Sequence, residues 1–338
     1  MVFVTGGTGL IGSYLLLELS KRGKRIRAMK RKNSNLQAVQ NLFLEFSDLA
    51  SFQKIQWVEA DLLEIPRLEK QLEGIETIYH TAASVGFDDR SKKPIHEINV
   101  TGTENLVNLA ISHSIPNFVY ISSIAVLDET PGEKRITENS KFDAQKVHSE
   151  YAISKKKAEM NVWRGSQEGL NVLVVYPAVV IGSLDGNRAS ERLFQLAGKK
   201  KAFATQGRTG YVDVRDVAFL MAELVEKEKW NESYILHSAE QSFINIFNHL
   251  RKKKNLGEAK LISKGKLKLV KAISQLSRIF GGPYMSESSY QALTGNSVYS
   301  NEKIKKETGI DFIPIQDALD FHSKRFEKIK NNNLNESV

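Results

Sequence analysis

A tyrosine and a lysine that lie four residues apart, Tyr151 and Lys155, could together move a proton. They lie near the start of a helix predicted over residues 149–168, where a spacing of four places two side chains on one face. A free tyrosine has a pKa of about 10, and a neighbouring ammonium stabilises the phenolate and lowers that pKa. The pair could then act as a general acid/base. The same spacing is common on helix surfaces, so the pair alone does not identify an active site.

Two serines, Ser122 and Ser123, could act as a partner for this pair. They end a strand predicted over residues 118–122, and the carboxyl ends of strands are where α/β folds bind their ligands. A serine hydroxyl at this place can hydrogen-bond a substrate carbonyl and polarise it.

Glycines at positions 6, 9 and 12 lie between a predicted strand, Val2–Thr5, and a predicted helix, Leu10–Lys21. This arrangement is typical of dinucleotide sites, because the glycines allow a tight turn and a close approach of the backbone to a pyrophosphate. The helix presents free N–H groups and its positive dipole end to the anion. The alternative is a glycine-rich turn that binds nothing. The residues predicted to contact a dinucleotide here are Gly6, Thr8, Gly9, Leu10, Ile11 and Gly12.

The end of the second predicted strand distinguishes NADP from NAD. A carboxylate there would bind the ribose 2′-hydroxyl of NAD, but residues 27–32 read Arg-Ala-Met-Lys-Arg-Lys and contain no acid. Arg31, with Lys30 or Lys32, could pair with a 2′-phosphate, so the sequence favours NADP. These cations could instead be solvated side chains of a surface loop.

The third and fourth predicted strands end in residues that could also contact the cofactor. Asp61 and Leu62 lie where an adenine would bind, and the Asp61 carboxylate could accept from the adenine amine or cap a helix that begins near Leu63. Ala82 and Ala83 are small enough to let a cofactor pass close to the backbone.

The segments that carry these residues alternate short apolar strands with amphipathic helices. This alternation predicts an α/β fold with a Rossmann-type doubly wound parallel sheet. We predict an NAD(P)-binding domain over residues 1–180, with residues 211–237 returning to it. Residues 181–210 and 238–330 are predicted to form a smaller, mainly helical substrate-binding lobe, and residues 331–338 a frayed tail.

The chain has 338 residues and a formal net charge of +9. Ten basic residues and one acid lie within residues 251–278, which leaves 38 of each sign elsewhere, so the charge does not indicate a broad nucleic-acid-binding surface. The absence of cysteine excludes disulfides, cysteine nucleophiles and thiolate metal sites, and no metal site is predicted. No basic and apolar leader precedes the first strand, and no run of about 18 apolar residues occurs. We therefore expect a cytoplasmic protein without a transmembrane segment.

Together these features resemble the extended short-chain dehydrogenase/reductase family, of the NAD-dependent epimerase/dehydratase type. The resemblance covers residues 1–216 and, more weakly, the rest of the chain. The segments that carry it are the Thr-Gly-x-x-Gly-x-x-Gly turn over residues 5–12, Asp61, Ala82-Ala83, Asn-Val-Thr-Gly-Thr over residues 99–103, Ser122-Ser123, Tyr151 with Lys155, and Tyr-Val-Asp-Val-Arg-Asp-Val-Ala over residues 211–218.

The resemblance implies a role for each residue of the predicted catalytic group. Ser123 is implied as the catalytic hydroxyl and Ser122 as mainly structural. Tyr151 is implied as the general acid/base, and Lys155 as the residue that activates it and holds the nicotinamide ribose, with an oxidised nicotinamide further stabilising the phenolate. Asn99 lies near the active centre in relatives, although here it could equally cap or pack a helix. Many relatives pair their long helices as dimers, so a homodimer is an expectation from the resemblance alone.

Departures from other branches of the family narrow the prediction. Residues 124–125 are Ile-Ala where sugar-nucleotide dehydratases carry Asp-Glu, and residues 126–128 are Val-Leu-Asp where many epimerases carry Val-Tyr-Gly. The apolar segment over residues 174–182 is similar to the dihydroflavonol-reductase and 3β-hydroxysteroid-dehydrogenase branch. The residues that this similarity places along the nicotinamide pocket are Pro177, Val179 and Val180.

We therefore expect an NAD(P)-dependent oxidoreductase that transfers a hydride between the nicotinamide C4 and a carbonyl or secondary alcohol of a small organic substrate. One alternative is a nucleotide-sugar epimerase with tightly bound NAD, and another is a non-catalytic dinucleotide sensor. Sensors commonly lose the tyrosine and lysine that this chain retains, which favours an enzyme.

The basic segment over residues 264–280 has apolar side chains at positions 267, 270, 273, 276 and 280, which form a stripe at helical spacing. The favoured interpretation is a lobe helix with its apolar face inward and its cations in water. The alternatives are docking on an anionic membrane surface and capture of an acidic substrate, such as a phosphorylated or coenzyme-A-linked one.

Overall fold

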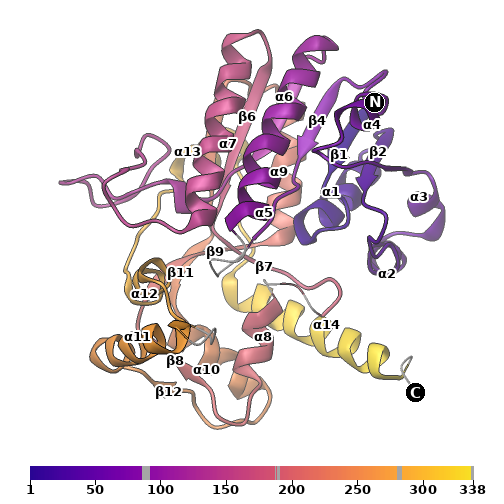
Figure 1. The fold of residues 1–338 in the computed structure, drawn as a ribbon. Helices are drawn as coiled ribbons and strands as arrows, with labels where there is room; N and C mark the ends of the chain where they lie inside the picture. Colours follow the sequence, from indigo (N-terminus) through magenta and orange to yellow (C-terminus); the bar gives the residue numbers. More distant parts are fainter. Residues whose placement is uncertain (86–91, 187, 189–190, 280–283, 336–338) are drawn as a thin grey trace.

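The computed structural model describes residues 1–85, 92–186, 188, 191–279 and 284–335. Seven parallel strands form one sheet in the order β10-β6-β5-β4-β1-β2-β3 (Figure 1). This confirms the predicted doubly wound α/β fold. The strands are β1 (Val2–Thr5), β2 (Ile26–Lys30), β3 (Gln56–Glu59), β4 (Thr77–His80), β5 (Asn117–Ile121), β6 (Asn171–Pro177) and β10 (Glu232–Leu236).

Helices cover the sheet because its central strands are apolar along their whole length. Phe118, Val119 and Tyr120 of β5 are fully buried, as is the run over residues 172–175 of β6, a pattern typical of strands with both faces covered. Helix α1 packs against α9, and α6 packs against α7. The helices of this domain are α1 (Leu10–Lys21), α2 (Gln37–Phe46), α3 (Leu49–Gln53), α4 (Ile65–Glu69), α5 (Lys92–His96), α6 (Gly102–Ser112), α7 (Glu150–Gln167) and α9 (Val214–Glu226).

A wider helical turn interrupts the long helix that precedes β5. The sequence predicts one helix over residues 94–112, whereas the structure has a π-helical turn, Glu97–Thr101, between α5 and α6. Such turns are rare and occur often at functional sites. This one carries Asn99, whose buried amide hydrogen-bonds two other segments of the chain.

Most of the remaining elements form a lobe with a second core (Figure 1). A three-stranded sheet joins β7 (Val179–Ile181), β9 (Arg208–Asp213) and β11 (Ala239–Ser242), and a two-stranded ribbon joins β8 (Phe203–Ala204) to β12 (Lys260–Leu261). The helices of the C-terminal half are α8 (Arg192–Ala197), α10 (Phe243–Lys253), α11 (Lys264–Ile279), α12 (Glu287–Thr294), α13 (Glu302–Thr308) and α14 (Ile315–Asn335). Of these, α13 packs against β10 and α9 of the sheet domain. No helix in the described ranges is long and apolar enough to cross a bilayer.

Buried polar side chains join the lobe to the large sheet domain. His322 of α14 is fully buried, with Nδ1 3.1 Å from the Ser183 hydroxyl and Nε2 3.3 Å from the Asp213 carboxylate. Asp213 also accepts the N–H of Arg215 and so caps α9. The hydrogen bonds from His322 and Arg215 hold the pKa of Asp213 at about 2, against the opposing effect of burial. Because these partners come from distant segments, the junction fixes α14 against the start of α9.

Two expectations for the C-terminal region are wrong. Residues 331–335, predicted to be frayed, continue α14 to Asn335, because the helical repeat of the preceding segment extends into them without a breaker. The apolar stripe of α11 was expected to face inward, but only Leu267 is buried, while Val270 and Ile273 are exposed. The side chains at positions 276 and 280 of the predicted stripe lie outside the described residues. The periodicity of apolar residues shows which side chains share a helix face, but not whether another part of the protein packs against that face. Here the described part of the chain leaves Val270 and Ile273 exposed.

The packing of α9 can be tested with two leucines of opposite exposure. Leu220 of α9 is fully buried, whereas Leu44 of α2 exposes 52% of its surface. We expect Leu220→Ala to lower the free energy of unfolding by about 2–5 kcal/mol, because it leaves a cavity, and Leu44→Ala by less than about 0.5 kcal/mol. Urea denaturation followed by circular dichroism measures both. Equal losses would contradict the assignment of α9 to the core.

Candidate active site

The glycine turn after β1 is pressed against the end of β4. A Cβ atom on Gly6 would lie 2.6 Å from the Ala82 nitrogen, and the φ of Gly6 is +69°. A Cβ atom on Gly12 would collide with the Gly6 carbonyl oxygen. Only glycine fits both positions, because any side chain would separate the turn from β4 or strain the backbone. The turn therefore brings the carboxyl ends of β1 and β4 to the start of α1.

The first turn of α1 is open to an anion. Gly9 is the N-cap residue and offers no side chain, and the first turn carries no acid. The orphan N–H groups of the residues that begin the helix, Leu10, Ile11 and Gly12, are therefore available with the positive end of the helix dipole. The side chain of Leu10 packs where a Cβ atom on Gly182 would be, which brings the end of β7 to this turn. This cradle fits a dinucleotide pyrophosphate.

A hollow of about 340 Å³ lies beside the turn, at the carboxyl ends of β1–β4. It collects residues from segments that are far apart in sequence. The predicted cofactor residues that line it are Gly6, Thr8, Gly9, Arg31, Asp61, Leu62, Ala82 and Ala83. The structure thus brings together eight of the positions chosen from the sequence.

The Arg31 and Asp61 side chains differ in how much they are already engaged. Arg31 is exposed, and its guanidinium has no acidic partner within 4 Å among the residues that the structure describes. Its backbone is fixed on Ser34, whose hydroxyl accepts its N–H and whose N–H donates to its carbonyl. Asp61 accepts the N–H of Leu63 through one oxygen at 2.9 Å. This bond closes a turn before α4, whose N-cap is Glu64, so Asp61 does not cap the helix; its other oxygen could accept a hydrogen bond from an adenine amine.

Arg188 is a residue of the hollow that the sequence does not reveal. It belongs to the segment between β7 and α8, yet its Nη2 donates to the Thr8 carbonyl at 2.9 Å. Its Nε lies 2.7 Å from the Asp185 carboxylate, in ion-pair contact. The guanidinium therefore lies over the glycine turn and could add positive charge for a pyrophosphate. No motif surrounds it, and 180 residues separate it from Thr8, so only the tertiary fold shows the contact.

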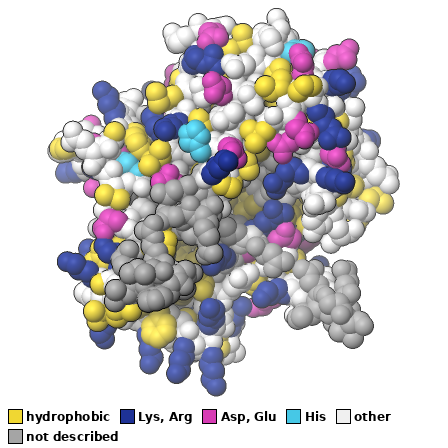
Figure 2. Space-filling model, viewed as in Figure 1, with side chains coloured by type: hydrophobic (Ala, Val, Ile, Leu, Met, Phe, Trp, Pro, Cys, Tyr) yellow, Lys and Arg dark blue, Asp and Glu magenta, His cyan; other side chains and the backbone are white. Residues whose placement is uncertain are grey.

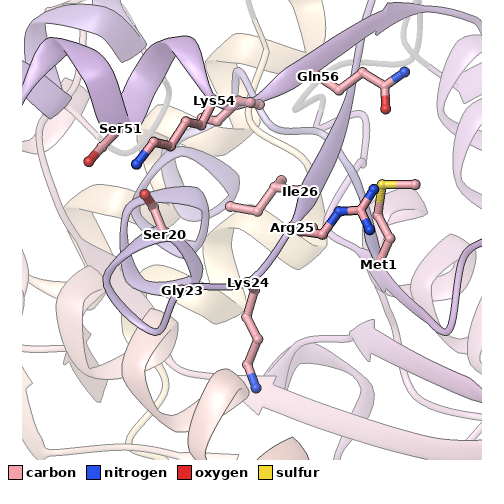
Figure 3. Close-up of a pocket in the computed structure, with 10 residues that line it drawn as sticks. Met1, Ser20, Gly23, Lys24, Arg25, Ile26, Ser51, Lys54 and Gln56 are labelled. Atoms are coloured by element: carbon pink, nitrogen blue, oxygen red, sulfur yellow. The ribbon is translucent and has the colours of Figure 1, made fainter.

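A second hollow, of about 460 Å³, lies at the opposite end of the same strands (Figure 3). Met1, Ile26 and Gln56, at the amino ends of β1, β2 and β3, line it together with Lys24 and Lys54. Figure 3 shows the Lys24 side chain pointing away from the other labelled side chains. This hollow contains none of the predicted catalytic or cofactor residues, and α/β folds bind ligands at the carboxyl ends of strands. The hollow beside the glycine turn is therefore the candidate cofactor site.

Tyr151 and Ser123 meet at the end of β5. Ser149 caps α7 by accepting the N–H of Ala152 at 3.1 Å, which fixes Tyr151 in the first turn. The Ser123 hydroxyl accepts the N–H of Ala125 at 3.2 Å and is near enough to the Tyr151 phenol to lower its pKa. Burial raises the pKa of Tyr151 to about 12, and the Ser123 hydroxyl opposes that rise.

The two effects that shift the pKa of Tyr151 in the protein without cofactor, burial and the Ser123 hydroxyl, do not include the charge of Lys155. The Lys155 side chain is buried, with Nζ 4.2 Å from the centre of the Tyr120 ring, a cation–π contact. Burial lowers the pKa of Lys155 to about 7, against the opposing charge of Glu159. A lysine half discharged at neutral pH stabilises a phenolate weakly, which explains why the effect of burial on Tyr151 prevails.

Ser122 is engaged on the side of β5 away from Tyr151. Its hydroxyl donates to Glu159 Oε2 at 2.7 Å, and both residues are buried. Tyr176 and Lys156 donate to the other oxygen of Glu159, at 3.2 and 2.8 Å. Ser122 therefore joins β5 to α7, and Ser123 is the hydroxyl that remains for a substrate.

Asn99 connects the cofactor hollow to the catalytic helix. Its Oδ1 accepts the N–H of Ser84 at 2.7 Å, and its Nδ2 donates to the Ser84 carbonyl and to the Ser154 hydroxyl, both at 2.9 Å. Ser84 lines the hollow, and Ser154 follows Tyr151 in α7 and donates to its carbonyl. The π-helical turn thus positions one amide that holds both halves of the site.

A buried histidine, His80, supports the same region in its neutral form. Desolvation and the charge of Lys155 lower its pKa to about 3. The Thr103 hydroxyl donates to the Asn99 carbonyl, so it accepts from His80 Nε2, 2.9 Å away. His80 Nδ1 then accepts from the Thr5 hydroxyl, 2.7 Å away. This assigns one tautomer and makes His80 a packing residue rather than a base.

The residues predicted to line a nicotinamide pocket lie at the end of β6 and in β7. Pro177 is the last residue of β6, and Ala178 donates its N–H to the Leu236 carbonyl at 3.0 Å. Val179 is exposed and Val180 is half-buried. An apolar wall of this kind could hold a nicotinamide face. These residues do not line the hollow beside the glycine turn, so the predicted site consists of that hollow and the adjoining edge of β5–β7.

Comparison with known proteins identifies the family of this chain. Residues 2–236 match the model of the NAD-dependent epimerase/dehydratase family. A putative dihydroflavonol 4-reductase of Synechocystis sp. is 30% identical over 218 residues, which cover 64% of this chain and only 60% of that protein. The structure of gox2253 is similar with a TM-score of 0.82 and 24% identity, over 97% of this chain and 98% of that one.

The structure of yeast methylglyoxal/isovaleraldehyde reductase Gre2 complexed with NADPH is similar with a TM-score of 0.76 and 19% identity, over 98% of this chain and 99% of that one. These two similarities show the fold. The family match covers the glycine turn, the end of β5 and the tyrosine–lysine pair. The chain is therefore a member of the NAD-dependent epimerase/dehydratase family of NAD(P)-binding enzymes, an extended short-chain dehydrogenase/reductase.

Proposed function

We propose that this protein is an NADP(H)-dependent carbonyl reductase that also catalyses the reverse oxidation of the alcohol. The observation that supports this most is that the Ser123 hydroxyl lies near enough to the Tyr151 phenol to lower its pKa, with Lys155 one helical turn further along α7. These groups lie at the edge of the sheet that also carries the cradle for a dinucleotide. The experiment that tests the proposal mixes the purified protein with NADPH or NADH and a panel of aldehydes, ketones and nucleotide-sugars, and follows the nicotinamide absorbance.

The bound nicotinamide would supply the hydride. The chain supplies the proton and holds the oxygen that receives it. Because the pKa of Tyr151 is about 12, its phenol remains protonated at neutral pH and can donate a proton to an oxygen that gains negative charge. Ser123 can donate a second hydrogen bond to that oxygen. Asn99, through Ser154, fixes the helix that carries Tyr151.

Two features support NADP over NAD. Arg31 faces the hollow without an acidic partner in the described part of the chain, and a guanidinium suits a phosphate because of its planar set of donors. Arg188, over the glycine turn, would face the pyrophosphate that NAD and NADP share, so it does not distinguish them. The yeast reductase of similar fold is itself complexed with NADPH.

An epimerase is the second candidate, since the family model includes epimerases. It would hold its cofactor through purification and interconvert nucleotide-sugars without net change in nicotinamide absorbance. Ile124 and Ala125 follow Ser123, and they provide no acid or base for the elimination that a dehydratase needs. Ile124 is buried and begins the short helical turn, Ile124–Val126, that the Ser123 hydroxyl caps.

Removal of one hydroxyl tests the proton donor. We expect Tyr151→Phe to lower kcat by about 10²–10⁴ and to leave NADPH affinity within about threefold, since the ring and its packing remain. Stopped-flow turnover and fluorescence titration with NADPH measure the two quantities. Unchanged turnover in this variant would disprove the assignment of Tyr151.

Two adjacent cations test the cofactor preference. Arg31 lines the hollow, whereas Lys32 is exposed outside it. We expect Arg31→Ser to weaken NADPH binding about tenfold or more without weakening NADH, because a charge-assisted contact to the 2′-phosphate is lost. Lys32→Ser should change neither. If Arg31→Ser weakened both cofactors equally, Arg31 would not read the 2′-phosphate.

The pKa of Lys155 predicts a pH dependence of cofactor binding. In the protein without cofactor this pKa is about 7; the phosphates of a bound dinucleotide favour the ammonium and raise it. Binding must then take up a proton above pH 7, so affinity falls as pH rises from 7 towards the raised pKa. Calorimetric titration with NADPH at pH 8, in two buffers of different ionisation enthalpy, measures the uptake. Lys155→Met should abolish it; uptake that persists in this variant would assign the proton to another group.

A further inference from the structure

The helix α11 presents an apolar surface that the described chain does not cover. Leu269, Val270 and Ile273 expose 62%, 49% and 59% of their surface. Their spacing of one and four residues places them on one side of the helix, and Leu267, one turn before Val270 at the edge of this stripe, is buried. The stripe is therefore buried against the lobe at Leu267 and exposed to solvent further along the helix.

Exposed lysines precede these side chains in the same helix. Lys264, Lys266 and Lys268 are exposed, and none has an acidic partner within 4 Å among the described residues. Lys271, by contrast, is paired with Glu287 of α12. The segment over residues 251–278 carries the entire positive excess of the chain. Figure 2 shows Lys and Arg side chains gathered over the lower part of the molecule, where Figure 1 places α10, α11 and β12.

The β8–β12 ribbon, which leads into α11, also combines exposed apolar residues with an exposed lysine. Phe203 of β8 and Leu261 of β12 expose about half of their surface, and Lys260, the register partner of Phe203, is exposed between them. Leu261 precedes the first residue of α11 by three positions. The lobe thus carries two neighbouring elements with exposed apolar residues and exposed lysines.

An anionic lipid surface is the partner that this composition fits. Aliphatic side chains beside lysines on a helix with a polar remainder are typical of helices that lie in the plane of a membrane interface, and each lysine is attracted by anionic headgroups. A nucleic acid would use the cations but not the exposed aliphatic side chains of α11. A second copy that presented the same face would bring like charges together.

We propose that α11 docks the lobe on an anionic phospholipid surface, with Leu269, Val270 and Ile273 entering the headgroup region and Lys264, Lys266 and Lys268 contacting the phosphates. This proposal is independent of the proposed reductase activity, because none of these residues belongs to the cofactor hollow or the catalytic group. It also accounts for why the apolar stripe of a charged helix remains uncovered.

Sedimentation of the full chain with vesicles tests the proposal. Vesicles of phosphatidylcholine with phosphatidylglycerol should bind the protein at low ionic strength, and vesicles of phosphatidylcholine alone should not. We expect the double variant Lys266→Gln/Lys268→Gln and the double variant Leu269→Ser/Ile273→Ser each to weaken binding about tenfold or more. The matched controls, Lys54→Gln/Lys70→Gln and Leu44→Ser, change exposed residues of the sheet domain and should retain binding. Affinity for NADPH reports that each variant is folded.

The docking of α11 can be followed with a fluorescent label at a single residue. Because the chain contains no cysteine, Ile273→Cys and, as a control, Leu44→Cys can each be labelled uniquely with an environment-sensitive fluorophore. Anionic vesicles should shift the emission of the first label to the blue and leave the second unchanged.

Four results would overturn the proposal. The first is no binding to anionic vesicles, and the second is binding that both α11 variants retain. The third is salt-sensitive binding to heparin or an oligonucleotide that Leu269→Ser/Ile273→Ser leaves intact while vesicle binding is absent, which would assign the surface to a polyanion. A concentration-dependent dimer that the same variant abolishes, again without vesicle binding, would assign it to a second copy.

Discussion

The close contact between the glycine turn and β4 is the constraint on which the site depends. Gly6 and Gly12 allow the ends of β1 and β4 to approach the start of α1 without an intervening side chain. That approach leaves the first N–H groups of α1 without side-chain partners and exposes them at the sheet edge. It also brings Ala82 and Ser84 to the same place, from which Asn99 reaches α7. A larger residue in the turn would therefore disturb both the cofactor cradle and the catalytic helix.

The electrostatics of the catalytic group follow from its burial. Tyr151 is held in its acid form and Lys155 near half charge, because burial removes the hydration of both groups. Neighbouring ionisable groups are engaged elsewhere: Glu159 is held by Ser122, Tyr176 and Lys156, and His80 is neutral. The protein thus provides a protonated donor, and a bound oxidised nicotinamide would supply further positive charge. In the reverse oxidation, that positive charge would stabilise the phenolate.

The parts of the fold that local sequence determines were predicted well. The strands β5 and β6 are continuous apolar runs, and the glycine spacing placed the turn between β1 and α1. The contacts that join distant segments were not predicted. Arg188 contacts Thr8, from which 180 residues of sequence separate it. The pKa of Lys155 depends on its burial, which its four-residue spacing from Tyr151 does not reveal. Val270 and Ile273 are exposed because no part of the described chain packs against them. The sequence pattern of the apolar stripe would be identical if another element covered it.

The central claim is that hydride leaves NADPH and ends on the carbonyl carbon of a second molecule. The most direct measurement uses NADPH deuterated at C4 with a carbonyl substrate that the panel identifies, and locates the deuterium by mass spectrometry and NMR. The account predicts stoichiometric loss of NADPH and one deuterium on the new carbinol carbon. A cofactor that stays bound and is returned unchanged, with a rearranged sugar as the product, would contradict it.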